Sequence, residues 1–372
     1  MSVLTNPKIA GVPAAIPEKM QAAVYYGKND LRMETVAVPR IGPGELLVRI
    51  HTCGICGTDL KKISTGSHTA PRVFGHEMTG VVVARGAGVT RFAIGDRVMV
   101  FHHIPCGTCY YCKRNVFSQC PVYKKVGATA GFGEASGGGF SEYIRVMDWI
   151  VERGVIRIPD GVSFEQASYI EPVNTVWKGI DALALQPEES VLVIGQGPIG
   201  LLLAKLAQRT GAKVTTSDLF PQRLTIGESY GLKDAIDSSR VNLLDAIRER
   251  TEGRGADVVI LAVGGSGLIR PAIDAARFGG RILLFAQTVR SEVVIDPAAV
   301  CVDEKTLLGS YSASVSLNEK VADFVFSGEM DLARLFSHRF PLDRALEALE
   351  LAAHPQPDTM KIAIQPGSTW EG

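Results

Sequence analysis

Four cysteines lie within fifteen residues of this 372-residue chain, in the stretch "IPCGTCYYCKRNVFSQC" that covers residues 104–120. Their spacing, C-x2-C-x2-C-x7-C, suits a tetrahedral zinc cage, because short C-x-x-C turns let successive thiolates converge on one ion. Such a closed cage leaves no open position on the metal, so it holds a loop together and does not catalyse. A redox dithiol, the competing interpretation, needs one reactive pair and has no use for two further cysteines. The predicted ligands are Cys106, Cys109, Cys112 and Cys120.

A second set of metal-binding residue types is scattered over "HTCGICGTDL", "VFGHEMTG" and "ASYIEPVNT". Each segment alone has an ordinary explanation, since a lone cysteine is usually core filling and a lone histidine a hydrogen-bonded structural residue. Together, Cys56, His76, Glu77 and Glu171 supply one thiolate, one imidazole and two carboxylates. That mixture is typical of a catalytic zinc, which keeps one position for water or substrate.

A glycine-rich turn follows the apolar run in "VLVIGQGPIG", with Gly195, Gly197 and Gly200 in a G-x-G-x-x-G pattern. The glycines permit a tight turn and close backbone approach, and a helix starting there offers N–H groups to a pyrophosphate. The next strand, "KVTTSD", ends in Asp218, eighteen residues after Gly200, where a carboxylate can accept hydrogen bonds from ribose hydroxyls. The alternative is a plain turn followed by a surface aspartate.

The same turn indicates which nicotinamide cofactor is bound. Asp218 would repel a 2'-phosphate, so NAD is favoured over NADP. Arg223 lies close enough in the sequence to keep some use of NADP open. Pro198 and Ile199, between the second and third glycines, complete the predicted cofactor-binding turn.

The composition limits the class of partner. Lys and Arg balance Asp and Glu at 39 each, so no net field draws the chain to nucleic acid or an anionic membrane. The N-terminus lacks a basic segment followed by an apolar run, and "IGLLLA" is far too short to span a bilayer. We therefore expect a cytoplasmic protein with a small neutral partner. In a reducing cytosol clustered cysteines more often bind metal or catalyse than form disulfides, and the seven cysteines are an odd number.

Two kinds of secondary structure must position these residues. From Gln21 to about Arg157, short β-branched segments punctuated by glycine predict a β-rich, barrel-like domain. After about Pro172, buried strands ("SVLVIG", "KVTTSD", "ADVVILAVG", "GRILLFA") alternate with helical stretches, which predicts a doubly wound parallel sheet in an α/β fold. The helical stretches "PIGLLLAKLAQRTG", "NLLDAIRERTEG" and "GLIRPAIDAARFGG" each end at glycine, as helices often do. From about Ala313 the alternation stops, and we expect the chain to rejoin the first domain.

In combination, "GICGTD", "GHE", the four-cysteine lobe and "GQGPIG" resemble the zinc-dependent medium-chain alcohol dehydrogenases, from about Gln21 to the C-terminus. Within that family "YIEP" resembles the polyol, sorbitol and threonine dehydrogenase branch, because Glu171 stands where simple alcohol dehydrogenases have a third zinc cysteine. The resemblance implies a GroES-like catalytic domain (1–172 and 313–372, with a structural zinc lobe at about 103–123) and a Rossmann domain (173–312). It also implies two zinc ions per chain, NAD, and a homotetramer or homodimer.

Roles in the catalytic zinc site follow from the same resemblance. Cys56 and His76 correspond to direct ligands, and Glu171 to a ligand that binds the metal directly or through water. Glu77 corresponds to a transient ligand. Asp59 matches the carboxylate that orients the histidine ligand and fixes its tautomer.

The resemblance also assigns a proton relay. Thr58 matches the hydroxyl that takes the substrate proton, but Lys61 stands where many relatives end the relay with a histidine. Protons then leave through the nicotinamide ribose to water, or Lys61 assists; a solvated lysine beside Lys62 is the simpler alternative. Cys53, three residues before the family's cysteine ligand, is expected to be structural, and so is Cys301.

His102 and His103 fall where the family lines its substrate pocket, and imidazoles there would suit a hydroxylated substrate. They are equally compatible with ordinary structural histidines. The expected activity is hydride transfer between NAD and a secondary alcohol, such as a polyol, sugar or cyclitol. An L-threonine- or amino-alcohol-type dehydrogenase is the alternative within the family. A non-catalytic nucleotide- and zinc-binding member is the alternative of another class, although a binding scaffold has no need of a proton relay.

Overall fold

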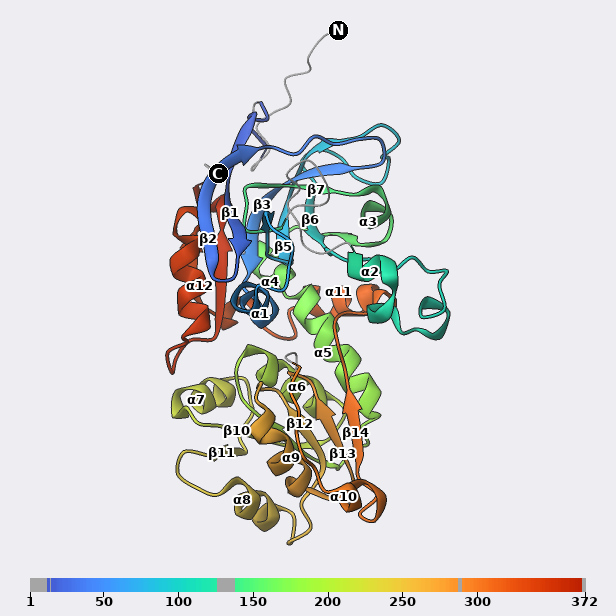
Figure 1. Cartoon of the computed structure of the whole chain (residues 1–372), viewed down its shortest axis with the longest axis vertical. Coiled ribbons are helices and arrows are strands. Elements are labelled where there is room, and N and C mark those ends of the chain that lie inside the picture. The colour runs from blue at the N-terminus through green and yellow to red at the C-terminus, as the bar shows by residue number, and fades with distance from the viewer. Residues whose placement is uncertain (1–11, 14, 126–137, 287–289, 370–372) are drawn as a thin grey trace. The chain divides into compact units, whose positions relative to one another are not determined.

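The computed structural model describes residues 12–13, 15–125, 138–286 and 290–369. Most of the N-terminal segment, where we expected no targeting signal, lies outside these residues. The described residues divide into two compact units, one formed by Met1–Glu171, Asn318–Pro355 and Lys361–Gly372, the other by Pro172–Leu317 and Gln356–Met360 (Figure 1). None of the helices in the described residues combines the length and apolarity needed to cross a membrane.

The first unit is built on two sheets. A three-stranded sheet has the order β2-β1-β4, and a seven-stranded sheet has the order β15-β16-β3-β5-β6-β8, with β7 also paired to β3. All pairs are antiparallel except β15 with β16. The strands are β1 (Lys19–Gly27), β2 (Asp30–Ala37), β3 (Leu46–Gly54), β4 (Arg72–Val73), β5 (Glu77–Arg85), β6 (Arg97–Val100), β7 (Tyr143–Val146), β8 (Val155–Arg157), β15 (Phe336–Pro341) and β16 (Lys361–Gln365).

The β-rich domain predicted for this part of the chain is confirmed, and short helices connect its strands. Strands β3 and β5 are buried along most of their length. The last strand, β16, lies beside β3, so the C-terminal segment shares a sheet with residues some 300 positions earlier. The helices are α1 (Gly57–Thr65), α2 (Pro121–Lys125), α3 (Asp148–Arg153), α4 (Phe164–Ser168), α11 (Asn318–Phe326) and α12 (Ala345–Ala353).

The second unit contains the predicted doubly wound sheet. Its six strands are all parallel, in the order β11-β10-β9-β12-β13-β14. The strands are β9 (Ser190–Ile194), β10 (Lys213–Asp218), β11 (Ala235–Asp237), β12 (Ala256–Leu261), β13 (Ala276–Leu284) and β14 (Thr306–Gly309). The helices are α5 (Ile170–Leu183, which starts in the first unit), α6 (Pro198–Arg209), α7 (Pro221–Ser229), α8 (Leu243–Arg250), α9 (Ile269–Ala275) and α10 (Pro297–Cys301).

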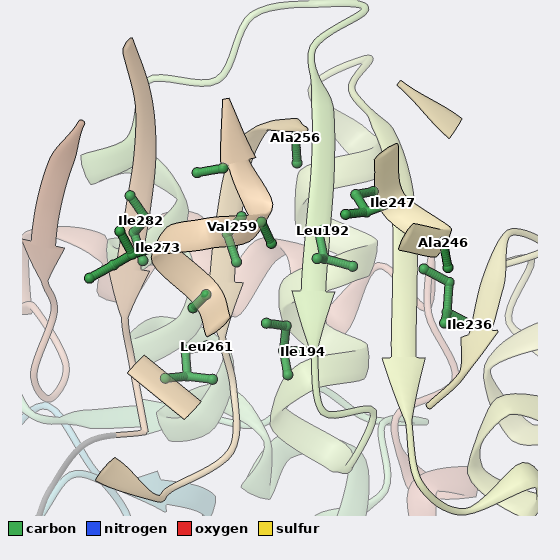
Figure 2. Packing of buried hydrophobic residues seen from close by; sticks show 13 residues of the cluster. Leu192, Ile194, Ile236, Ala246, Ile247, Ala256, Val259, Leu261, Ile273 and Ile282 are labelled. Carbon is green, nitrogen blue, oxygen red and sulfur yellow. The ribbon is translucent and has the colours of Figure 1, made fainter. Parts of the chain in front are cut away.

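One core cluster fixes helices against this sheet. Figure 2 shows side chains from β9 and β12, among them Leu192 and Val259, in the same cluster as Ile247 of α8 and Ile273 of α9. All four side chains are buried. Parallel strands covered by helices are mostly apolar, which is why β9 and β12 appeared in the sequence as nearly continuous apolar runs.

The predicted end of one helix is wrong. We expected the stretch "GLIRPAIDAARFGG" to remain helical up to its glycines, but α9 ends at Ala275. Ala276 adopts an extended conformation and pairs with Ala256, so β13 begins at once and runs through both glycines. By contrast α6 does end just before a left-handed glycine, Gly211 at φ +88°.

Candidate zinc and cofactor sites

The four clustered cysteines lie in the loop between β6 and α2. Their sulfurs are close together: Cys106 to Cys112 is 3.9 Å, Cys109 to Cys112 is 3.5 Å, and Cys120 to Cys106 is 3.6 Å. A tetrahedral zinc with Zn–S bonds of about 2.3 Å requires sulfurs about 3.8 Å apart. The four side chains therefore fit a closed zinc cage, and none of the seven cysteines forms a disulfide.

Local hydrogen-bond donors stabilise the thiolate form of the cysteines in this loop. The N–H of Cys106 donates to the sulfur of Cys120 at 3.4 Å, and the Thr108 hydroxyl donates to the sulfur of Cys106 at 3.7 Å. Hydrogen bonds from Thr108 and Cys109 lower the pKa of Cys106 to about 6. A thiolate is the form that binds zinc, so these donors favour metal binding at neutral pH.

The second candidate site begins at the first turn of α1. Cys56 precedes the helix as its N-cap, and its sulfur accepts the N–H of Thr58 at 3.5 Å. The Asp59 carboxylate returns to accept the N–H of Cys56 at 3.3 Å, which completes a capping box. The helix start therefore fixes the positions of Cys56, Thr58 and Asp59 relative to one another.

His76 and Glu77 reach the same place from the start of β5. His76 Nδ1 lies 3.0 Å from Asp59 Oδ1, so Nε2 is the ring nitrogen left for a metal. Burial lowers the pKa of His76, but Asp59 and Cys56 outweigh it and raise that pKa well above its usual range. One ligand atom each from Cys56, His76 and Glu77 lie within 4.8 Å of one another, so a thiolate, an imidazole and a carboxylate fit one zinc ion.

Glu171 is not in that group of three. It lies at the start of α5, and its side chain is buried. Burial, together with the nearby charge of Glu77, raises the pKa of Glu171 to about 7, whereas His76 lowers it. The structure thus brings Glu77 into the ligand group and leaves Glu171 as a buried carboxyl group in the same electrostatic environment. Its role as a ligand stays a prediction.

The rings of the two predicted pocket histidines lie in a row beside His76. The ring of His102 lies 4.7 Å from that of His76 and 3.7 Å from that of His103, which in turn stacks on Tyr123 at 4.5 Å. Burial lowers the pKa of His102 well below its usual range, so the ring is neutral. Among the described residues, nothing hydrogen-bonds to its buried Nδ1 atom.

The residues of the predicted relay lie on α1. Thr58 is in its first turn, beside Cys56. Lys61 lines a cavity of about 740 Å³ together with Leu60 of the same helix and Leu349 of α12. None of the predicted zinc ligands lines this cavity. The part that Lys61 takes in proton transfer therefore stays a prediction.

The glycine-rich turn in the second unit has the geometry that the motif requires. Gly195 has φ +94°, and a Cβ atom on Gly200 would lie 1.8 Å from the Gly195 carbonyl oxygen, so neither position accepts a larger residue without movement. Gly197 caps α6, and Pro198 occupies its first turn, followed by Ile199. A helix N-terminus therefore faces the turn, as a pyrophosphate site needs.

Asp218 ends β10 beside this turn. One of its oxygens accepts the N–H of Gln196 at 2.7 Å, and the other accepts the N–H of Phe220 at 2.9 Å. Arg223 Nη1 lies 3.8 Å from the same carboxylate. Each carboxylate oxygen can accept a further hydrogen bond, so Asp218 is held in place and remains able to bind hydroxyl groups.

Comparison with known proteins agrees with these features. Residues 42–160 match the family model of the alcohol dehydrogenase GroES-like domain, and residues 198–327 match that of zinc-binding dehydrogenases. The chain is 32% identical over 340 residues to an L-threonine 3-dehydrogenase of Rhizobium johnstonii, covering 89% of this chain and 95% of the relative. The chain belongs to the zinc-dependent medium-chain alcohol dehydrogenase family.

Two further relatives of this medium-chain dehydrogenase cover nearly its whole length. It is 29% identical to a sorbitol dehydrogenase of Bacillus subtilis, over 94% of this chain and 98% of the relative. A structure described as a zinc-binding dehydrogenase from Sinorhizobium meliloti 1021 bound to NADP has a TM-score of 0.83 and 27% identity, over 94% of this chain and all of that one. These comparisons confirm the resemblance to the polyol and threonine dehydrogenase branch, and the GroES-like and Rossmann folds.

One buried residue of this dehydrogenase escaped the sequence analysis. Lys361, at the start of β16, places its ammonium group 2.7 Å from Oε1 and 2.5 Å from Oε2 of Glu77. The two residues are 284 positions apart in the chain. The only sequence signal was a single lysine at the start of the apolar strand "KIAIQ", which is also compatible with an exposed strand end.

Proposed function

We propose that this chain is a zinc-dependent dehydrogenase that oxidises a secondary alcohol of the polyol, sugar or cyclitol type, with NAD as hydride acceptor. The observation that carries the proposal is the convergence of Cys56, His76 and Glu77, with Asp59 holding the imidazole. A zinc ion bound there would act as a Lewis acid on the substrate hydroxyl and lower its pKa toward neutrality.

The surrounding residues have separate tasks in this proposal. Cys56 and His76 bind the metal, and Asp59 keeps the proton on Nδ1 so that Nε2 faces the metal. Glu171 binds directly or through water, and Glu77 binds transiently. Thr58, hydrogen-bonded to Cys56 through its backbone, accepts the hydroxyl proton through its side chain.

The proton would leave Thr58 either through the nicotinamide ribose to water or with the help of Lys61. His102, with its available ring nitrogen, and His103 orient further hydroxyl groups of the substrate. The four-cysteine loop holds a second, structural zinc.

The second unit supplies the cofactor site. The turn Gly195–Gly200 binds the pyrophosphate at the start of α6, and Asp218 binds the ribose hydroxyls. Asp218 supports NAD over NADP. Arg223, beside that carboxylate, is the residue that would tolerate a 2'-phosphate. A relative described as bound to NADP makes this preference a point to test.

The relatives support a small hydroxylated substrate but favour more than one. Sorbitol dehydrogenase supports a polyol, whereas L-threonine 3-dehydrogenase supports an amino alcohol. We favour a polyol because burial lowers the pKa of His102 and its Nδ1 atom has no hydrogen-bond partner among the described residues, which suits a hydroxyl group. A homotetramer or homodimer in the cytoplasm is part of the same proposal.

The decisive experiment is a substrate panel. Polyols, aldoses, inositols, L-threonine and simple secondary alcohols would be assayed with NAD and with NADP, using protein of measured zinc content. We expect NADH formation from a polyol-type substrate and its loss in the Cys56→Ser variant. No turnover on any substrate, with both zinc sites filled, would contradict the proposal and favour the non-catalytic alternative.

A further inference from the structure

A buried ion pair crosses three strands next to the candidate catalytic zinc site. Glu77 on β5 pairs with Gly54 on β3, and Gly54 in turn pairs with Ala363 on β16. Lys361 lies two residues before Ala363 and therefore on the same face of the sheet. Its ammonium group reaches across the middle strand to both oxygens of Glu77.

Gly54 makes this contact possible. A Cβ atom at Gly54 would lie 2.1 Å from Glu77 Oε2 and 2.9 Å from Lys361 Cε, so any other residue would push the pair apart. The pair thus depends on a missing side chain in the middle strand. That arrangement keeps the carboxylate close to the backbone of β3.

The pair is too deeply buried to be an ordinary surface salt bridge. The side chains of Lys361 and Glu77 are 6% and 2% exposed. A buried pair is weak evidence for stability, because apolar residues of similar volume often serve as well. Breaking it from one side, however, leaves an uncompensated charge. Glu77 is also one of the three residues whose ligand atoms converge, so its charge has two possible partners: the ammonium group and a metal ion.

We propose that Lys361 is a positioning residue that competes with the metal for Glu77 and so keeps a coordination position open for substrate. This inference rests on the proposed catalytic zinc site. With Lys361 present, its ammonium group draws both Glu77 oxygens toward itself, so the carboxylate would be a weak, exchangeable ligand. Without Lys361, no ammonium group would hold the Glu77 carboxylate, and Glu77 would become a permanent ligand of the metal.

Cobalt substitution provides the readout, because the visible bands of Co²⁺ change with coordination number, while the four-thiolate site serves as an internal reference. In Lys361→Met we expect weaker visible bands from cobalt at the mixed-donor site, which is the site of Cys56, His76 and Glu77. We also expect about tenfold slower release of that metal to a chelator, because groups beside the ligands change metal affinity on this scale. Lys361→Arg should keep the parent spectrum.

Lys361→Met also removes the repulsion between the Lys361 ammonium group and the metal ion. A double-mutant cycle separates that effect from the effect of Lys361 on Glu77. In the Glu77→Gln background, Lys361→Met should leave the cobalt bands unchanged. Gly54→Ala displaces the pair without removing either charge and should reproduce the spectral change, which covers the case in which Lys361→Met does not fold. Lys305→Met, which removes a buried lysine bonded to the Ile273 carbonyl at 2.9 Å in the other unit, is the matched control.

Two results would overturn the inference, and they are distinguishable. Cobalt at the mixed-donor site with bands identical in the parent, Lys361→Met and Gly54→Ala proteins would rule out a role for Lys361 in setting the ligands. A parent protein that takes up cobalt at the four-cysteine site alone would contradict the proposed catalytic site, and this inference with it.

Discussion

The two candidate zinc sites are built in opposite ways. The four cysteines of the loop at 106–120 lie close in sequence, and their sulfurs meet through turns of the local backbone. The second site assembles Cys56 from a helix start with Glu77 from the start of a strand and His76 just before it, next to buried Asp59 and Lys361. A closed site can thus be specified by one loop, whereas a site that keeps a position open needs a sheet and buried charges to hold its ligands.

The largest effect should come from breaking the open site. Cys56→Ser removes the thiolate ligand, and we expect turnover to fall by about a thousandfold or more, since Lewis-acid catalysis is worth several kcal/mol. The fold should survive because the serine hydroxyl can still cap α1. Activity, zinc content and thermal unfolding of the variant check this. If Cys56→Ser lowered the melting temperature as much as Cys106→Ser in the four-cysteine loop, the assignment of one catalytic and one structural site would be contradicted.

Breaking the closed site should have the reverse effect. In Cys106→Ser the loop loses a zinc ligand, and we expect the melting temperature to fall by about 10 °C, with the metal of the open site retained. Differential scanning calorimetry with parallel zinc analysis measures this. Unchanged thermal stability at matched zinc content would show that the loop is not held by a structural metal.

A change in the cofactor turn of the second unit should leave both zinc sites filled. Asp218→Ala removes a charged acceptor from the cofactor turn, and we expect about tenfold weaker NAD binding and a narrower preference over NADP. Zinc content should stay at the parent value. The ratio of kcat/KM for NAD and NADP, measured in parent and variant, is the test. An unchanged ratio would count against the ribose contact.

The smallest expected effect is on how stability depends on pH, and it comes from Glu171 beside the open site. Burial raises the pKa of Glu171 to about 7, above its value in the unfolded chain. The native state therefore binds more protons between these two pKa values, and the stability of metal-free protein should fall as pH rises from about 4.5 to 7. We expect Glu171→Gln to reduce this fall by about 5 °C in melting temperature. Equal pH dependence of the two proteins would contradict the assignment.

Local signals explain what the sequence could predict. The cysteine spacing and the glycine-rich turn each belong to one short stretch, and the geometry of Gly195 and Gly200 matches the motif. The parallel sheet was also predictable, because each buried strand is a short stretch of apolar residues in the sequence. The end of α9 was missed because Ala275 and Ala276 both favour a helix, and the pairing of Ala276 with Ala256 overrides that local preference.

Long-range pairing explains what the sequence could not show. The contact of Lys361 with Glu77 depends on the strand order β16-β3-β5 and on a glycine in the middle strand. Neither residue carries a local motif for it. Glu77, and not Glu171, lies with Cys56 and His76 in the group of possible ligands. This too depends on where β5 begins relative to α1.

The most direct test is a crystal structure of zinc-loaded protein with anomalous scattering measured at the zinc edge. Two peaks per chain are predicted, one enclosed by the four cysteines and one bonded to Cys56 and His76. A single peak within the four-cysteine loop, at full zinc loading, would contradict a catalytic zinc in this protein.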